Sequence, residues 1–171
     1  MTDGKNLLPI DRFLWTLDIV RREGAQLQYS WDQLFVQRDA TDPAWIASLA
    51  SQPDEAVELE AFVSRFARMQ DNIADKLIPR WLECLAERQG SQIENLNKAE
   101  RLGIIESTES WLIARRLRNL LVHEYMNDVE TFASALAEVK QLALMLINTQ
   151  QRITEYAKTH MGITINQDTD R

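Results

Sequence analysis

Apolar residues recur at intervals of three and four along most of the chain, and this spacing constrains the fold more than any other feature. It is the period of an amphipathic α-helix that has one apolar face. Pro9 suits the first turn of a helix, where its missing N–H costs nothing, so we predict a first helix from Pro9 to about Gln37. Gly24 lies in step with the apolar face and either permits close helix approach or marks a bend. The apolar face comprises Ile10, Leu14, Leu17, Val20, Leu27, Trp31 and Leu34.

A second helix is predicted to begin at Pro53, after a loop with one short helical turn between Arg38 and Gln52. Two acidic residues follow the proline, at the end of the helix dipole where negative charge is stabilising. Pro79 removes one helix hydrogen bond, so we expect a kink there before the pattern continues towards Gly90. The apolar face before the kink comprises Leu59, Phe62, Phe66, Met69, Ile73 and Leu77.

End signals predict three further helices in the second half of the chain. A short helix around residues 94–102 should end at Gly103, because glycine readily takes the left-handed conformation of a helix stop. Ser107 is the expected N-cap of the next helix. Asn127, with Glu130 three positions later, resembles a capping box that opens the last helix. That helix runs to about Thr159 with an apolar face of Phe132, Leu136, Val139, Ala143, Leu146, Ile147 and Ile153.

The chain contains no alternating strand pattern and no internal repeat, and its five glycines and four prolines are few. We therefore predict an all-α fold, an up-and-down bundle of about four long helices plus a short helix. A length of 171 residues suits one domain. We assign residues 1–161 to that domain and interpret the polar residues 162–171 as a disordered tail.

Charge and composition limit the classes of function. A formal net charge of −7 argues against nucleic-acid binding over the whole surface. The interval from Lys98 to His123 nevertheless holds five lysines or arginines and only three glutamates. The single cysteine, Cys84, excludes an internal disulfide framework and fits a reducing compartment. Because we find neither a signal-peptide pattern nor an apolar run of roughly 20 residues, we expect a cytoplasmic protein without a membrane partner.

The chemistry that we expect is concentrated in residues 115–125. Arg118 is followed directly by Asn119, five positions later by His123 and two positions after that by Tyr125. A guanidinium group can hold phosphate oxygens, and an imidazole can move protons near neutral pH, so this set suits a phosphodiester substrate. We find no nucleotide-binding P-loop, no zinc pattern and no Ser-His-Asp arrangement, and we expect no metal and no cofactor.

On a continuous helix, these residues would face different directions. At roughly 100° per residue, Arg118 and Tyr125 would lie about 20° apart, whereas His123 would lie about 140° from Arg118. Asn119 and His123, four positions apart, would form a neighbouring stripe. A single straight helix therefore cannot direct Arg118 and His123 at one atom. Two copies that cross near a two-fold axis could combine the arginine of one with the histidine of the other.

Each of these residues also has a purely structural interpretation. A histidine near a helix C-terminus is favoured by the dipole and can bond the last carbonyl groups. Arg118 can pair with an acid across the bundle, and Tyr125 can pack in the core. The combination, rather than any single residue, distinguishes a functional site from these alternatives.

The combination resembles the signature of HEPN domains (higher eukaryotes and prokaryotes nucleotide-binding), and in particular the HepT-type toxins with the pattern Arg-x4-His-x-Tyr. Arg118, Asn119, His123 and Tyr125 match this pattern. The resemblance extends over roughly residues 94–155, whereas the first two helices match only as generic bundle helices. Arg-x4-His alone is a weak signal. With the asparagine, the tyrosine and an all-α frame it is fairly specific.

The resemblance implies a metal-independent endoribonuclease that acts as a homodimer and is held in check by a minimal nucleotidyltransferase antitoxin. In that mechanism the 2′-hydroxyl of the RNA attacks the adjacent phosphate. His123 would be the general acid or base, Arg118 would stabilise the phosphorane charge, and Asn119 would position the substrate. Tyr125 would accept AMP from the antitoxin. Arg115 and Arg116 are candidates for RNA contact.

Two alternatives remain. Some HEPN proteins resemble non-catalytic partners that bind nucleotide or substrate for a separate nucleotidyltransferase, and the acidic balance suits such a protein-binding module. A structural helical-bundle subunit, with the motif as a coincidence, is the other. RNA cleavage that is lost on His123→Ala would separate the nuclease from both.

Overall fold

The structure, a computed structural model, describes residues 7–122 and 127–165, and every regular element within them is helical. The all-α class predicted from the sequence is confirmed. The elements are α1 (Pro9–Phe35), α2 (Pro43–Ser48), the short 3-10 helix η2 (Leu49–Ser51), α3 (Pro53–Asn72), the π-helical segment η3 (Ile73–Leu77), α4 (Ile78–Cys84), α5 (Gln92–Arg101), α6 (Thr108–Leu121) and α7 (Val129–His160).

Local end signals position most of these boundaries as predicted. Pro9 and Pro53 each occupy the first turn of a helix. Gly103 has a φ of 79°, and its N–H donates to Glu100 O at 3.0 Å. The N–H of Ile104 reaches back to Ala99 O at 2.9 Å, which completes a Schellman stop for α5.

Two predicted boundaries are wrong. The apolar pattern after Pro79 suggested a helix that continues towards Gly90, but α4 ends at Cys84. The N-cap of α7 is Asp128, whose carboxylate accepts a hydrogen bond from the Thr131 N–H at 3.0 Å. Both Asn127 and Asp128 are good capping residues, so the local pattern could not distinguish the two neighbouring starts.

The π-helical segment η3 lies just before Pro79, where we expected a kink. Met69, Ile73, Leu77 and Trp81 are fully buried although they follow one another at steps of four. In a regular α-helix, three such steps would rotate the last side chain by about 120° from the first. The wider π turn offsets this drift and keeps one apolar face towards the core.

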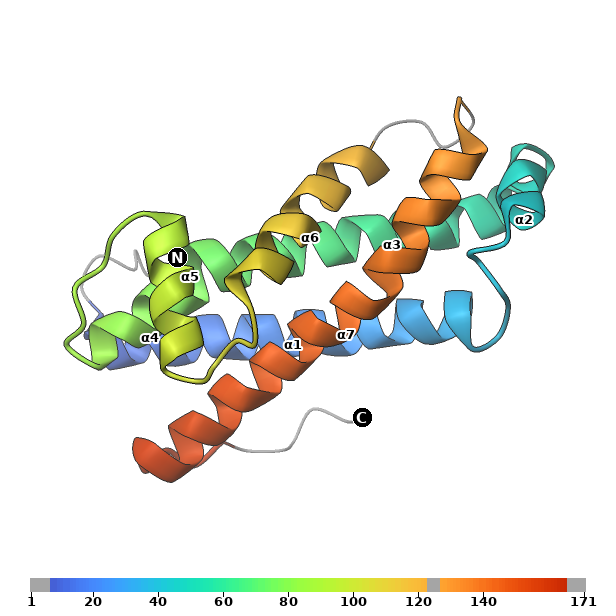
Figure 1. The fold of residues 1–171 in the computed structure, drawn as a ribbon. Coiled ribbons are helices and arrows are strands. Elements are labelled where there is room, and N and C mark those ends of the chain that lie inside the picture. Colours follow the sequence, from blue (N-terminus) through green and yellow to red (C-terminus); the bar gives the residue numbers. More distant parts are fainter. Residues whose placement is uncertain (1–6, 123–126, 166–171) are drawn as a thin grey trace.

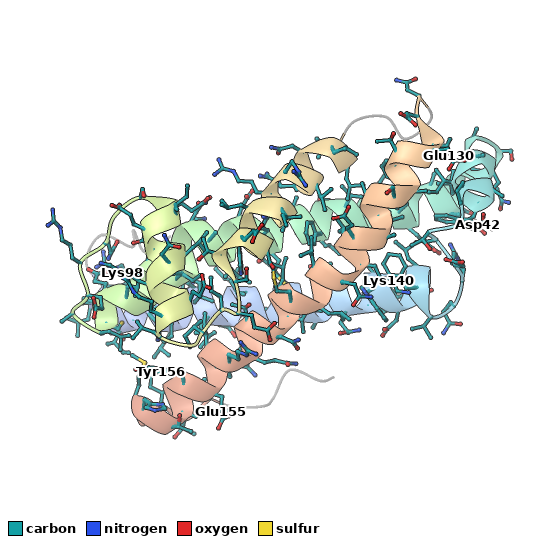
Figure 2. All side chains as sticks on the ribbon, viewed as in Figure 1. Asp42, Lys98, Glu130, Lys140, Glu155 and Tyr156 are labelled. Atoms are coloured by element: carbon teal, nitrogen blue, oxygen red, sulfur yellow. The ribbon has the colours of Figure 1, made fainter. Side chains whose placement is uncertain are left out.

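The helices pack in crossed layers. In Figure 1, α1 and α3 lie side by side and run in opposite directions. Helix α7 passes α3 and then crosses α1, with α6 next to it over α3. The centre of the core is aromatic, and its largest fully buried side chains are Trp81, Trp111, Phe13, Phe62 and Phe66. Figure 2 labels Lys140 on α7, where the Lys140 carbonyl oxygen accepts a hydrogen bond from Trp31 Nε1 of α1 at 2.8 Å.

Gly24 marks a close approach of helices rather than a bend in α1. A Cβ atom at this position would lie 3.3 Å from Met69 Cε of α3 and 3.4 Å from Gln150 Oε1 of α7. The missing side chain therefore lets α1 pack tightly between these two helices.

The predicted tail begins with residues that contact the domain. Ile163 and Ile165 pack against the core, and the Ile163 N–H donates to Ala157 O at 3.2 Å. Residues 166–171 lie outside the described residues. Among residues 7–122 and 127–165, no helix is long and apolar enough to cross a membrane.

Candidate active site beside Arg118

Helix α6 presents Arg115 and Arg118 along one edge of its buried face, in line with buried Trp111. The hydroxyl of Ser107 caps the helix by accepting from the Ser110 N–H at 3.2 Å. The buried face of α6 packs mainly against α7 and α3, and consists of Thr108, Trp111, Ala114, Leu117 and Leu121. Arg115 and Arg118 are one helical turn apart, so their side chains lie next to each other. Both line a pocket that is shared with α3.

Arg118 is held by a residue from a distant part of the chain. Its Nη2 atom lies 2.7 Å from Asp71 Oδ2, near the end of α3 and 47 positions earlier in the sequence. The side chains are 29% and 45% exposed, respectively, so the pair is neither deeply buried nor fully solvated. The ion pair across the bundle that the structural interpretation allowed for Arg118 is therefore present.

A second set of contacts holds Arg115. Its Nη1 atom donates to Gln92 Oε1 of α5 at 2.9 Å, and Gln92 Nε2 in turn donates to Asp75 Oδ1 in η3. Gln92 thus bridges one acid and one base across three elements of the chain. Two aspartates and two arginines therefore line the same pocket, and their formal charges cancel.

These residues surround a polar pocket of about 220 Å³, which we call the Arg118 pocket. Below its rim, Gln70 and Trp111 are buried, and Gln70 Nε2 donates to the Trp111 carbonyl oxygen at 3.4 Å. Gln70 Oε1 and Trp111 Nε1 have no hydrogen-bond partner among the described residues. The lining residues are Gln70, Asp71, Ala74, Asp75, Gln92, Leu96, Trp111, Arg115 and Arg118.

Partial burial perturbs the carboxyl group of Asp71. Desolvation raises the pKa of Asp71, and the neighbouring Asp75 raises it further, while Arg118 and Arg115 lower it. Burial is the largest of these effects, so the net shift is upward even though Asp71 forms an ion pair. The charge of Asp71 is therefore lost at a higher pH than that of an ordinary aspartate.

The structure brings together only part of the predicted site. Arg118 and Arg115 line the pocket, whereas Arg116 and Asn119 are exposed and do not line it. His123 and Tyr125 lie outside the described residues. Because α6 ends at Leu121, the angles expected on a continuous helix apply only as far as that residue.

Asp71, Asp75 and Gln92 are the site residues that the sequence did not reveal. Asp71 and Asp75 are four positions apart on the polar side of the predicted second helix, which is a weak signal for a shared function. The sequence around α3 does not indicate which side chains bind these two aspartates, because Gln92 lies on α5 and Arg118 lies on α6.

The described residues offer no obvious metal site, since residues 7–122 and 127–165 contain no group of three His, Cys, Asp or Glu side chains that could hold a metal ion. No protein-family model, no curated protein and no solved structure matches this chain.

Proposed function

We propose that this protein is a HEPN-like, HepT-type endoribonuclease that cleaves RNA without a metal ion. The observation that supports the proposal most strongly is the position of Arg118. Its guanidinium group is half-buried and fixed at the rim of a polar pocket, five residues before His123 in the sequence. A positioned guanidinium group and a titratable imidazole can supply the charge stabilisation and the proton transfer that a 2′-hydroxyl attack on phosphorus requires.

In the proposed reaction the 2′-oxygen of the RNA forms a bond to the adjacent phosphorus, and the bond from phosphorus to the 5′-oxygen breaks. The products are a 2′,3′-cyclic phosphate and a free 5′-hydroxyl end. His123 either accepts the 2′ proton as general base or donates a proton to the leaving 5′-oxygen as general acid, and water fills the other of these two roles. Arg118 stabilises the charge on the phosphorane oxygens. Asn119 positions the substrate, and Arg115 and Arg116 contact the RNA.

We further propose that the active form is a homodimer, in which Arg118 of one protomer works with His123 of the other. The up-and-down arrangement of the four long helices belongs to the same proposal, because it would let two copies of α6 meet near a two-fold axis. A protein of this kind would act in the cytoplasm.

A minimal nucleotidyltransferase antitoxin would silence the site by attaching AMP to Tyr125. The modification adds a negative phosphodiester charge and a bulky nucleoside two positions after His123 in the sequence. The negative charge can pair with Arg118. With ATP and a nucleotidyltransferase from the same operon, we expect the mass of the wild type to rise by AMP units and cleavage to stop. Tyr125→Phe should remain unmodified and active. AMP on Tyr29 or Tyr156 instead would contradict this role of Tyr125.

Cleavage of a labelled RNA by the purified protein in the presence of a chelator tests the nuclease directly. His123→Ala should reduce the rate by roughly 10²- to 10⁴-fold, because general acid–base catalysis contributes about that much. Circular dichroism would verify that the variant is folded. A requirement for Mg²⁺, or normal cleavage by His123→Ala, would reject the mechanism.

The second candidate is a non-catalytic partner of a nucleotidyltransferase, and the ion pair of Arg118 with Asp71 favours it. An arginine that already has a carboxylate partner is less available to a phosphate. In this case, neither the wild type nor any Asp71 variant would cleave RNA, while the protein would bind its nucleotidyltransferase stably.

A further inference from the structure

Helix α5 carries charged side chains on the face opposite the Arg118 pocket. Gln92 and Leu96, four positions apart, line that pocket. A separate groove of about 440 Å³ is lined by Glu94, Lys98 and Arg101, which are spaced four and three positions apart along α5. The two sets lie about half a turn apart around α5. Helix α5 therefore separates the Arg118 pocket from this second groove.

This second hollow, the α5 groove, has three cationic side chains. Lys98 and Arg101 come from α5, and Arg88 comes from the connection between α4 and α5. Figure 2 labels Lys98 on α5, where its Nζ atom donates to the Arg88 carbonyl oxygen and so links the helix to the connection. Among the described residues, none of the three side chains forms an ion pair. Together with the hydrogen bonds from Ser91, the charges of Lys98 and Arg88 nevertheless lower the pKa of the Glu94 carboxyl, so the charge of the groove is that of three cations and one acid.

The acidic residues of α5 accept hydrogen bonds at the starts of helices. Glu94 is the only acid that lines the groove, and its Oε2 atom accepts a hydrogen bond from the Ser91 N–H at 2.6 Å in a capping box. Glu100 Oε2 accepts from the Thr108 N–H at 3.0 Å at the start of α6. Hydrogen bonds to these backbone N–H groups lower the pKa of both carboxyl groups. Both acids thus stabilise helix starts, and the three cations outnumber the one acid that lines the groove.

The remaining surface of the groove is polar, since Gln89, Gly90 and Asn97 complete it. A protein partner would require apolar anchors in a well-packed centre, and none of the lining residues is a large hydrophobic one. A phosphate backbone requires only positive charge and hydrogen-bond donors. The lining therefore favours a nucleic acid over an acidic protein.

We propose that the α5 groove binds the phosphate backbone of single-stranded RNA that flanks the bond cleaved at Arg118. This inference rests on the proposed function, because it assigns the groove to the same substrate. The strand would pass over α5, whose diameter of about 10–12 Å separates the groove from the Arg118 pocket. A protein with a net charge of −7 would thereby confine RNA to one end of the bundle.

The salt dependence of RNA binding tests the groove. The probe is a fluorescent single-stranded RNA with 2′-O-methyl groups, which cannot undergo 2′-hydroxyl attack, and anisotropy gives its affinity at about 50 to 200 mM salt. The double variant Arg88→Gln/Arg101→Gln should reduce the slope of log affinity against log salt concentration by roughly 1.4, or about 0.7 for each lost phosphate contact.

The matched control is Arg21→Gln/Lys158→Gln, which removes the same charge from a groove between α1 and α7 and should leave the slope unchanged. Circular dichroism would establish that both double variants are folded. An equal loss in both double variants, no loss in the α5 variant, or no RNA binding by the wild type would overturn the proposal. Tighter binding of a fluorescent poly-glutamate peptide than of the RNA would assign the groove to an acidic protein instead.

The two proposals fail in different ways. A wild type that cleaves unmodified RNA, combined with an unchanged slope in the α5 variant, would reject the groove and leave the nuclease standing. A wild type that binds RNA through the groove but cleaves nothing would reject the nuclease and leave the groove standing.

Discussion

The Arg118 pocket and the groove between α1 and α7 are both lined by acids, bases and amides, but their charges are fixed in different ways. In the pocket, Arg118 meets an acid that lies 47 positions away in the sequence. In the α1–α7 groove, Arg22 pairs with Asp18, one turn earlier on the same helix. The groove is also larger, at about 720 Å³ compared with 220 Å³.

The difference concerns how each arginine is oriented, but a long-range ion pair alone does not mark a site, since Arg152 and Glu106 form one beside another pocket. A pair within one helix forms wherever that helix is exposed, and it leaves both side chains mobile. A pair between elements far apart in the sequence restricts the arginine to one direction once the fold has formed. Catalysis benefits from groups that are already oriented before the substrate arrives. The Arg118 pocket meets this condition, whereas the α1–α7 groove does not.

The largest expected effect is on the rate of RNA cleavage, and it should distinguish Arg118 from Arg22. Arg118→Ala should reduce the rate of RNA cleavage by about 10²- to 10³-fold, because one donor to a transition-state oxyanion contributes about that much. Arg22→Ala should cleave at the wild-type rate. Initial rates on a labelled RNA, with thermal melts of both variants, would measure the contrast. Equal losses in the two variants would remove the distinction between pocket and groove.

A smaller effect is expected for the acid that holds Arg118. Asp71→Ala should reduce the turnover number roughly tenfold, since a guanidinium group that loses its partner is misplaced rather than removed. Asp71→Glu, which retains the charge, should recover part of the rate, and Asp18→Ala should have no effect. A faster Asp71→Ala variant would instead identify the ion pair as an inhibitory contact.

Glu23 tests the cost of a carboxylate that is buried without an ion pair. It is 9% exposed, Asn72 Nδ2 donates to its Oε1 at 2.6 Å, and its Oε2 has no hydrogen-bond partner among the described residues. Burial raises the pKa of Glu23, although the Asn72 hydrogen bond and the charges of Arg68 and Lys76 lower it. The folded protein therefore binds the proton more tightly than the unfolded chain. This favours the fold at low pH and is lost as the pH rises through the raised pKa.

Glu23→Gln should consequently be more stable than the wild type at pH 8, by roughly 1 kcal/mol, because it avoids a desolvated charge. The advantage should shrink as the pH falls below the raised pKa. Urea unfolding of both proteins at several pH values gives the free energies, and the exposed Glu60→Gln serves as the control. A difference that does not depend on pH would show that Glu23 does not titrate within this range.

The smallest expected effect is the coupling energy of the two ion pairs. A double-mutant cycle on Arg118 and Asp71 should give about 0.5–1 kcal/mol of unfolding free energy, because the pair is partly desolvated. The cycle on Arg22 and Asp18 should give less than about 0.5 kcal/mol, as usual for exposed pairs one turn apart. Urea denaturation of the wild type and the six variants measures both. Equal coupling energies would mean that an ion pair between distant elements is no stronger than one within a single helix.

The helices themselves could be predicted from the sequence because their signals are local. The period of the apolar residues, Pro9 and Pro53 at helix starts, and Gly103 at a helix stop each act within a few residues. The Ser107 cap is equally local. Where two neighbouring residues offer the same cap chemistry, as at Asn127 and Asp128, the prediction was wrong by one position.

The site could be predicted only where its residues are close in sequence. The motif singled out Arg118, but its partner Asp71 and the Gln92 bridge depend on how α3 and α5 pack against α6. Such contacts are set by the tertiary fold, and no spacing within one helix encodes them.

The π-helical segment has a consequence for chain length. Between Met69 and Trp81, η3 contains one residue more than a regular helix would need to bring both side chains to the same face. Eleven α-helical steps, instead of twelve, would rotate the second side chain only about 20° from the first. A chain without Lys76, which is exposed, and with alanine in place of Pro79 could therefore form an uninterrupted helix with the same buried face. At this point we expect the domain to tolerate the loss of one residue, which would put a regular helix out of register.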